Sequence, residues 1–333
     1  MKWIPICLLL LFFLGCKTKP AAPDVSKIPV KLKVQRFEDA FFGLDSMHLE
    51  EALNELERKY PGFAKDFIFN IMGTTPSTAA GDIKSFSNSY RPMYDSVKKH
   101  FANFQPLADQ VEMGLKYVKY YFPNYAVPTN LVTFIGPINS YGNIITTDAL
   151  AVGLQLYMGK DYALYKTDMG QQLYPSYLSN RFEQAYIPIN CMNNIIEDLY
   201  PNKSLGTALV DQLVETGKRQ YVLDHLLPST ADSLKLGYSG QQVVDCNNNE
   251  SNIWAFFIQN NLLYVTEPEI TKEYMNEGPN TPALGSNFPG FIGKYVGWKI
   301  VQKYMDNHPD LDLAKLMETP ARKIFEEAKY KPR

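Results

Sequence analysis

The chain has 333 residues, of which 45% are hydrophobic, 13% aromatic and 20% charged. A chain of this size and composition buries a large core without needing a disulfide or a metal, which excludes disorder over most of its length. Its 33 Lys and Arg residues stand against 35 Asp and Glu, giving a net charge of -2. Because phosphate recognition needs an excess of basic side chains, we expect no nucleic acid partner.

The first residues predict export and lipid attachment. Lys2 gives a positive start, and residues 4–14 form an apolar run that is too short to span a bilayer but suits a signal-peptide core. The run ends in Leu14-Gly15-Cys16, which resembles the lipobox of bacterial lipoproteins. That resemblance implies cleavage before Cys16 and its acylation with several chains, which gives stable anchoring. The alternatives are an ordinary cleaved signal, in which Cys16 is incidental, or a buried N-terminal helix.

These features predict the domain organisation. Residues 1–15 form a lipoprotein signal peptide, residues 16–27 contain the lipidated Cys16 and a flexible tether, and residues 28–333 form one globular domain. The tether is predicted from the polar stretch rich in Pro and Ala at 17–25. We therefore expect a protein of the cell envelope, anchored to a membrane by lipid and facing the periplasm.

The first part of the predicted domain combines a strand with helices. Apolar and polar residues alternate over 28–37, which predicts a half-buried strand. Helical spacing of apolar residues predicts a helix over 47–59, ended by Tyr60-Pro61-Gly62. The small polar stretch 73–81 is a predicted loop, and further helices are expected over 82–104 and 107–122.

The remaining elements are mainly helical. Short β-like runs occur at 131–135 and 143–147, and a helix is predicted over 149–158. Helices are then expected at 182–199, 206–227, 240–262 and 289–306, with a short one near the C-terminus. Pro188 should kink the first of these or mark its true start. The predicted fold class is mainly α (α+β), one compact helical domain with a small β-sheet.

Motifs that would assign a reaction are missing from the sequence. The four histidines, His48, His100, His225 and His308, are too scattered to form the H-E-x-x-H zinc motif. The segment 245–249 begins like a calcium loop, but Glu250 occupies the position that needs glycine, so a polar break in or before a helix is expected instead. We predict no catalytic residue, no cofactor-binding residue and no metal site.

A serine and two cysteines have structural interpretations. Ser239 is expected to cap the helix that follows it, since its surroundings lack the spacing of a nucleophile elbow. Cys191 and Cys246 either form a disulfide, as an exported domain allows, or remain as two buried thiols.

Glycines mark the helix predicted over 289–306. Pro289 suits its first turn, while Gly290, Gly293 and Gly297 lie three and four residues apart and so share one face. Three glycines on one face imply a backbone held close to a neighbour, because each costs a helix about 1 kcal/mol relative to alanine. We favour tight helix–helix packing; the alternative is the floor of a groove that binds a peptide or a partner helix.

Several short motifs in order resemble the gliding motility lipoprotein GldB family. The resemblance covers residues 1 to about 307 and rests on the lipobox, the Lys27–Val30 strand, Val34–Phe42, Tyr120–Pro123, Tyr157–Asp161, Gly217-Lys218, Leu223–Pro228, Asn249–Trp254 and Gly297–Met305. It implies an envelope lipoprotein needed for gliding over surfaces, in machinery linked to a dedicated protein-secretion system. The family supplies no established catalytic residues, so none are transferred.

A more remote resemblance connects the chain with predicted zinc peptidases. The stretch Ile187–Ile196 corresponds to their zinc-binding helix, but it carries Asn190 and Asn194 where the two histidines would stand. Amide oxygens are poor zinc ligands, and no glutamate lies between them to act as a general base. The resemblance implies a degenerate zincin-like scaffold without its metal.

The function expected from the sequence is binding rather than catalysis. We predict a non-catalytic component of the gliding motility apparatus that contacts the membrane through its anchor and binds other envelope motility or secretion proteins. One alternative is an envelope peptidase or hydrolase with a scattered active site. The other is a solute-binding lipoprotein, although two similar lobes around a cleft are not evident.

Overall fold

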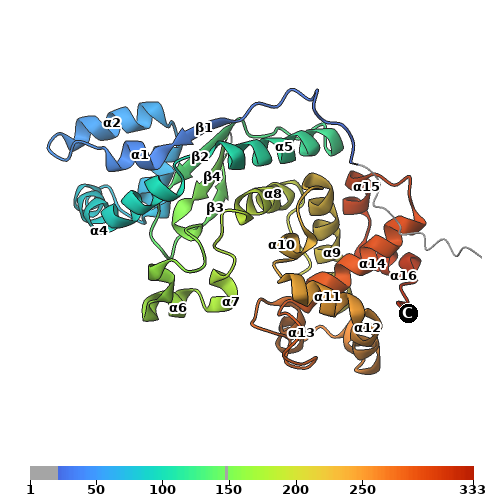
Figure 1. The fold of residues 1–333 in the computed structure, drawn as a ribbon. Coiled ribbons are helices and arrows are strands. Elements are labelled where there is room, and N and C mark those ends of the chain that lie inside the picture. Colours follow the sequence, from blue (N-terminus) through green and yellow to red (C-terminus); the bar gives the residue numbers. More distant parts are fainter. Residues whose placement is uncertain (1–21, 147–148) are drawn as a thin grey trace, which may run out of the picture.

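The computed structural model describes residues 22–146 and 149–333, in which one small sheet and its covering helices lie beside a larger group of C-terminal helices (Figure 1). The predicted signal peptide and Cys16 lie outside the described residues. The sheet has the order β1-β2-β4-β3, formed by β1 (Lys33–Arg36), β2 (Asn130–Phe134), β4 (Ala149–Gly153) and β3 (Asn143–Ile145). β2 pairs in parallel with both β1 and β4, whereas β3 pairs antiparallel with β4. The predicted fold class, mainly helical with a small sheet, is confirmed.

The helix predicted over 149–158 is wrong. Residues 149–153 form the buried strand β4, and Leu154–Leu156 form a 3-10 turn. β4 lies between β2 and β3, so all of its residues are buried. A short apolar run that is buried on both faces does not show the period of a strand, and Ala149, Leu150 and Ala151 favour a helix by intrinsic propensity. Pairing with neighbouring strands overrides that propensity.

β1 is shorter than the strand predicted over 28–37, because pairing with β2 begins only at Lys33 and the chain enters α1 (Phe37–Phe42) directly after Arg36. Buried charge fixes this junction. Glu38 is almost fully buried, forms an ion pair with Arg36 and accepts a 2.7 Å hydrogen bond from the Thr133 hydroxyl in β2. Arg36 also donates to the Phe101 carbonyl at 2.9 Å. The first strand is therefore attached to its neighbours by side chains as well as by its backbone.

The remaining N-terminal elements cover the sheet. They are α2 (Leu49–Lys59), α3 (Phe63–Lys65), a π-helical turn (Asp66–Ile71), α4 (Ala79–His100) and α5 (Gln105–Tyr121). The helices predicted over 47–59, 82–104 and 107–122 are confirmed with small shifts of their ends. The rings of Phe37, Phe41 and Phe67 pack with centroids 4.8 to 5.9 Å apart and form the centre of this part of the core.

The C-terminal part is built around two long helices, α9 (Leu209–Leu226) and α14 (Ile292–Asn307) (Figure 1). They touch through glycines: a Cβ at Gly297 would lie 1.7 Å from the Leu213 carbonyl oxygen, and one at Gly217 would lie 2.1 Å from the Gly297 carbonyl oxygen. The favoured interpretation of the glycine face, tight helix packing, is confirmed for Gly293 and Gly297. Pro289 and Gly290 instead precede α14, which begins at Ile292.

Shorter helices surround this pair. They are α10 (Asp232–Leu236), α11 (Gly240–Asn248), α12 (Glu250–Gln259), α13 (Pro268–Met275), α15 (Leu313–Glu318) and α16 (Ala321–Ala328). The short helices α6 (Asp168–Leu173) and α7 (Ser176–Ser179) lie apart from them, below the sheet in Figure 1. The single helix predicted over 240–262 is two helices that meet at Asn249, which agrees with the expected polar break. Ser239 caps α11 as predicted, accepting from the Gln242 backbone N–H at 3.1 Å.

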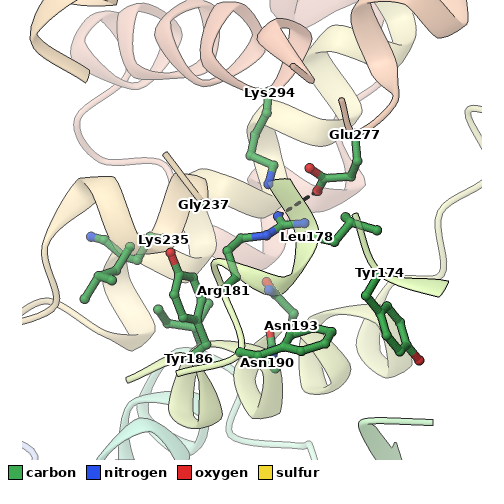
Figure 2. A pocket seen from close by; sticks show the side chains of 13 residues that line it. Tyr174, Leu178, Arg181, Tyr186, Asn190, Asn193, Lys235, Gly237, Glu277 and Lys294 are labelled. Carbon is green, nitrogen blue, oxygen red and sulfur yellow. Dashed lines mark hydrogen bonds and ion pairs between the residues drawn. The ribbon is translucent and has the colours of Figure 1, made fainter. Parts of the chain in front are cut away.

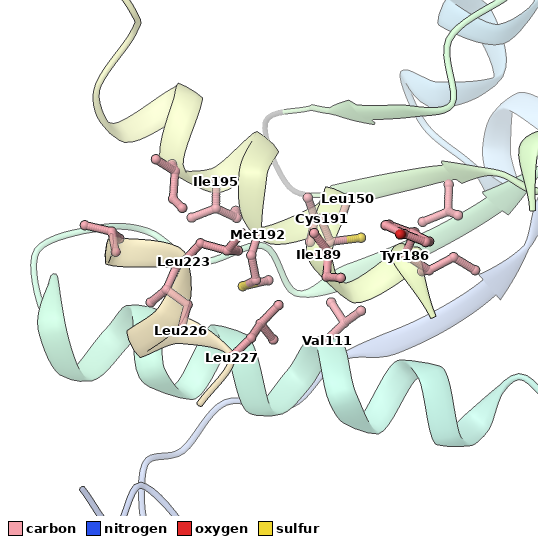
Figure 3. Close-up of a cluster of buried hydrophobic side chains, with 14 of the residues drawn as sticks. Val111, Leu150, Tyr186, Ile189, Cys191, Met192, Ile195, Leu223, Leu226 and Leu227 are labelled. Carbon is pink, nitrogen blue, oxygen red and sulfur yellow. The ribbon is translucent and has the colours of Figure 1, made fainter. Parts of the chain in front are cut away.

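α8 (Tyr186–Leu199) lies between the two parts of the fold. It begins four residues later than predicted and places Pro188 in its first turn. Its buried face packs Cys191, Met192 and Ile195 against side chains of α5, β4 and α9, which Figure 3 shows from close by. Within the described ranges, every helix is too short or too polar to cross a bilayer.

Candidate functional site

The outer face of α8 is polar. Asn190, Asn193, Asn194 and Glu197 follow one another at positions i, i+3, i+4 and i+7, so they form one stripe opposite the buried face. Asn190 and Asn194 were singled out from the sequence, and the structure places both on this stripe. Asn193, which sequence reasoning missed, is the most exposed of the three asparagines.

Three cavities are lined by residues of this stripe, and a fourth shares lining residues with the first of them. A cavity of about 360 Å³ shares Phe182, Asn190 and Asn193 with one of about 230 Å³. The smaller one shares Asn194 with a cavity of about 340 Å³, and the first shares Arg181 and Glu277 with one of about 380 Å³. We call these four adjoining cavities the α8 furrow. Its walls come from chain segments far apart in the sequence.

One end of the furrow is basic (Figure 2). Arg181 forms a 2.8 Å ion pair with Glu277, and Lys294 of α14 projects toward this pair. Lys294 donates a 3.1 Å hydrogen bond to the Leu236 carbonyl. Burial lowers the pKa of Lys294 to about 8; the Glu277 carboxylate opposes this change and the Arg181 guanidinium adds to it. Two cations and one carboxylate leave this end with a positive charge.

Lys235 also lines this end of the furrow, but its charge is directed elsewhere. Its ammonium group is buried and forms ion pairs with Asp224 at 2.7 Å and Asp232 at 3.2 Å. Asp224 accepts a further hydrogen bond of 2.6 Å from the Trp298 indole. Burial raises the pKa of Asp224 despite its cationic neighbour. This group joins α9, α10 and α14 behind the furrow and supports the wall that carries Lys294.

The middle of the furrow contains a chain of hydrogen bonds. The Asn190 amide donates to the Tyr157 hydroxyl at 2.7 Å, and that hydroxyl donates to the Asn143 side-chain oxygen. The Asn143 amide in turn donates to the Cys191 sulfur at 3.5 Å. Burial raises the pKa of the Cys191 thiol to about 12, which keeps it protonated near neutral pH. The Asn190 amide thus acts as a hydrogen-bond donor in this chain.

The opposite end of the furrow is acidic. Glu197 and Asp198 line the cavity there together with Ile145 of β3. Asp198 accepts a 2.7 Å hydrogen bond from the Tyr125 hydroxyl, a partner that brings no positive charge. Glu197 lies 3.3 Å from the Arg219 guanidinium, which offsets its charge. The furrow therefore runs from a net positive end to a net negative end.

Other residues considered from the sequence do not join this site. His225 and His308 each bond through Nδ1 to a carbonyl of their own helix at 2.8 Å, and His48 pairs with Asp45 at the surface. Across residues 22–146 and 149–333, no three His, Cys, Asp or Glu side chains gather in a way that would hold a metal ion. Cys191 and Cys246 are separate buried thiols, so the disulfide alternative is wrong in this structure.

Comparison with known proteins gives one match. A family model described as gliding motility protein GldB matches residues 18–332, nearly the whole chain. The comparisons with curated proteins and with solved structures found no match.

Proposed function

This chain belongs to the gliding motility protein GldB family, and we propose that it is a lipid-anchored, non-catalytic component of the gliding apparatus that binds another envelope protein. The family description supports the connection with gliding motility. The lipobox-like end at Cys16 supports the anchor, and the proposed location is the periplasmic side of an envelope membrane.

The α8 furrow carries the proposal that the protein acts by binding. Amide groups along its floor and charges of opposite sign at its ends suit the recognition of a polar or charged chain. The sulfur nearest to the floor, that of Cys191, is held as a thiol by burial and thus lacks the thiolate that nucleophilic chemistry uses. The side chains along the furrow are therefore arranged for hydrogen bonding and charge recognition.

The test is a deletion strain of a gliding host, complemented with variants of the gene. The wild-type gene should restore single-cell movement. Cys16→Ala should leave the protein unlabelled by lipid and fail to restore movement. Asn193→Arg, which fills the furrow from an exposed position, should restore movement poorly although the protein accumulates normally.

The matched control is Asn54→Arg, since Asn54 is also exposed on a helix, α2, but lies outside the furrow. It should restore movement like the wild type. Normal gliding of the deletion strain would contradict a role in motility. One tightly bound zinc ion per purified chain, with peptide cleavage that a chelator abolishes, would contradict the non-catalytic assignment.

A further inference from the structure

β3 presents an unpaired backbone edge beside the α8 furrow. It is the last strand on its side of the sheet in the described part of the chain. The Gly153 N–H donates to the Gly142 carbonyl, and the Thr146 N–H donates to the Ala149 carbonyl at 2.8 Å. Because hydrogen-bonded and non-bonded pairs alternate in an antiparallel ladder, Ile144 bonds to β4, whereas the backbone groups of Asn143 and Ile145 are directed away from it.

This edge follows the furrow. Asn143 lines the middle cavity with Asn190 and Asn194, and Ile145 lines the next cavity with Asn194 and Asp198. β3 also packs against α8, and Figure 3 shows both elements beside the buried cluster. A backbone edge and a stripe of amide side chains therefore border the same hollow, and together they offer the two kinds of hydrogen bond that an extended chain makes.

Charge adds a direction to this arrangement. β3 runs from the middle of the furrow at Asn143 toward the acidic end at Ile145. A strand added antiparallel, which is the commoner and slightly more stable pairing, would start near Asp198 and finish near Arg181 and Lys294. Charge complementarity then requires a basic residue early in that strand and an acidic residue late in it.

We propose that the α8 furrow binds an extended segment of a partner protein, which adds to β3 as an antiparallel strand with its basic end at Asp198 and its acidic end at Arg181 and Lys294. This inference rests on the proposed function, because it names what the binding site takes. The α8 face from Tyr186 to Asp198 is about 18 Å long at about 1.5 Å per residue. An extended strand covers that length in about six residues. Strand addition gives affinity through the backbone and specificity through the side-chain sites.

Binding is tested with fluorescent peptides and the full-length lipoprotein in detergent, by fluorescence anisotropy. The probe is the peptide Lys-Thr-Val-Thr-Val-Asp, and its partner is the charge-exchanged Asp-Thr-Val-Thr-Val-Lys. The first should bind several-fold more tightly at low salt, with the difference decreasing as salt is added. Equal binding of the two peptides would overturn the proposed direction and charge recognition.

A proline substitution tests the backbone contact itself. Ile145→Pro removes an N–H that is directed away from β4, so it leaves the ladder intact, as edge-strand prolines do. The comparison variant is Ile145→Ala, which loses the side chain but keeps the N–H. The proline variant should bind the probe peptide about threefold to tenfold more weakly than the alanine variant, which is the effect of one hydrogen bond. Equal affinities of the two variants would refute strand addition.

Asp198→Lys provides a test that does not depend on the strand. It reverses the charge at the acidic end from an exposed position, so both ends of the furrow become positive and the preference between the two peptides should disappear. An unchanged preference would contradict the inference. The outcomes are separable from those of the deletion strain: peptide binding without a motility defect would refute the proposed function, whereas a motility defect without peptide binding would refute only this inference.

Discussion

The contact between α9 and α14 makes a quantitative prediction for the substitution Gly297→Ala. The added methyl group would lie 1.7 Å from the Leu213 carbonyl oxygen, where an ordinary contact begins at 3.4 Å. The methyl carbon is fixed to the backbone of α14 and the oxygen belongs to the backbone of α9, so no side-chain rotation relieves the overlap. The two helices must move apart by more than 1 Å at this point.

The magnitude follows from two opposing effects. When the methyl group pushes α9 and α14 apart, a gap of about 0.5 to 1 Å between facing atoms already removes a quarter to a half of their dispersion attraction. Overpacking a well-filled core costs about 1 to 3 kcal/mol, and contact between rigid backbones belongs at the upper end of that range. Replacing glycine by alanine inside a helix contributes about 1 kcal/mol in the other direction. We therefore expect Gly297→Ala to lower the free energy of unfolding by about 2 kcal/mol.

Gly81→Ala is the matched control. Gly81 also lies in a helix, α4, but a Cβ there would have no neighbour within 4 Å. Only the helix propensity then acts, and the free energy of unfolding should rise by up to about 1 kcal/mol. Urea unfolding followed by circular dichroism measures both variants. Changes of the same sign in the two variants would refute the argument from backbone contact.

Three further predictions concern buried polar and thiol groups. Since the pKa of Lys294 falls from 10.5 to about 8 on folding, its charge destabilises the folded state at pH 7, and Lys294→Met should stabilise it by about 2 kcal/mol after the loss of one hydrogen bond. That gain in stability should shrink as the pH rises from about 8 to 10.5, because in this range the unfolded chain still binds a proton that the folded chain has lost. Urea unfolding at pH 7 and at pH 10 measures the change. A gain that stays constant would contradict the burial of the charge. Asp224→Asn should destabilise the protein by about 3 kcal/mol, since Lys235 then keeps only Asp232 as an ionic partner, and adding Lys235→Met should recover part of the loss in the same unfolding assay. Cys191 and Cys246, whose pKa values burial raises to about 12, should react with a thiol reagent only after urea unfolding; rapid labelling of the folded protein would contradict their burial.

The fold could be predicted from the sequence where local signals agree with tertiary contacts. The helix around Leu49–Lys59 shows both an apolar stripe and a clear stop at Tyr60-Pro61-Gly62, and it formed within two residues of the predicted start. Ser239 is a similar case, since its cap depends on Gln242 three residues later. In contrast, β4 exists because β2 and β3 flank it, and that information is not contained in residues 149–153.

The candidate site was predicted only in part. Asn190 and Asn194 were noted because their spacing places them on one helix face, and this is a local property of α8. The same rule would have added Asn193, three residues beyond Asn190. Arg181, Glu277 and Lys294 meet only when distant segments fold together, and no spacing in the sequence relates them. The charged end of the furrow could therefore not be predicted from the sequence, because it depends on contacts between distant segments.

The attachment of β1 has a mechanical consequence. β1 is the first strand of the described residues, and it pairs with β2 in parallel from Lys33 to Arg36. A force that pulls the preceding segment along the strand axis loads these backbone bonds together in shear, because they lie across that axis. The ion pair of Arg36 with Glu38 and its bond to the Phe101 carbonyl hold the far end of the strand. In a domain tethered at its N-terminus, a pulling force would therefore be shared by the hydrogen bonds between β1 and β2 and carried into the sheet. These bonds would not break one after another from the start of the strand.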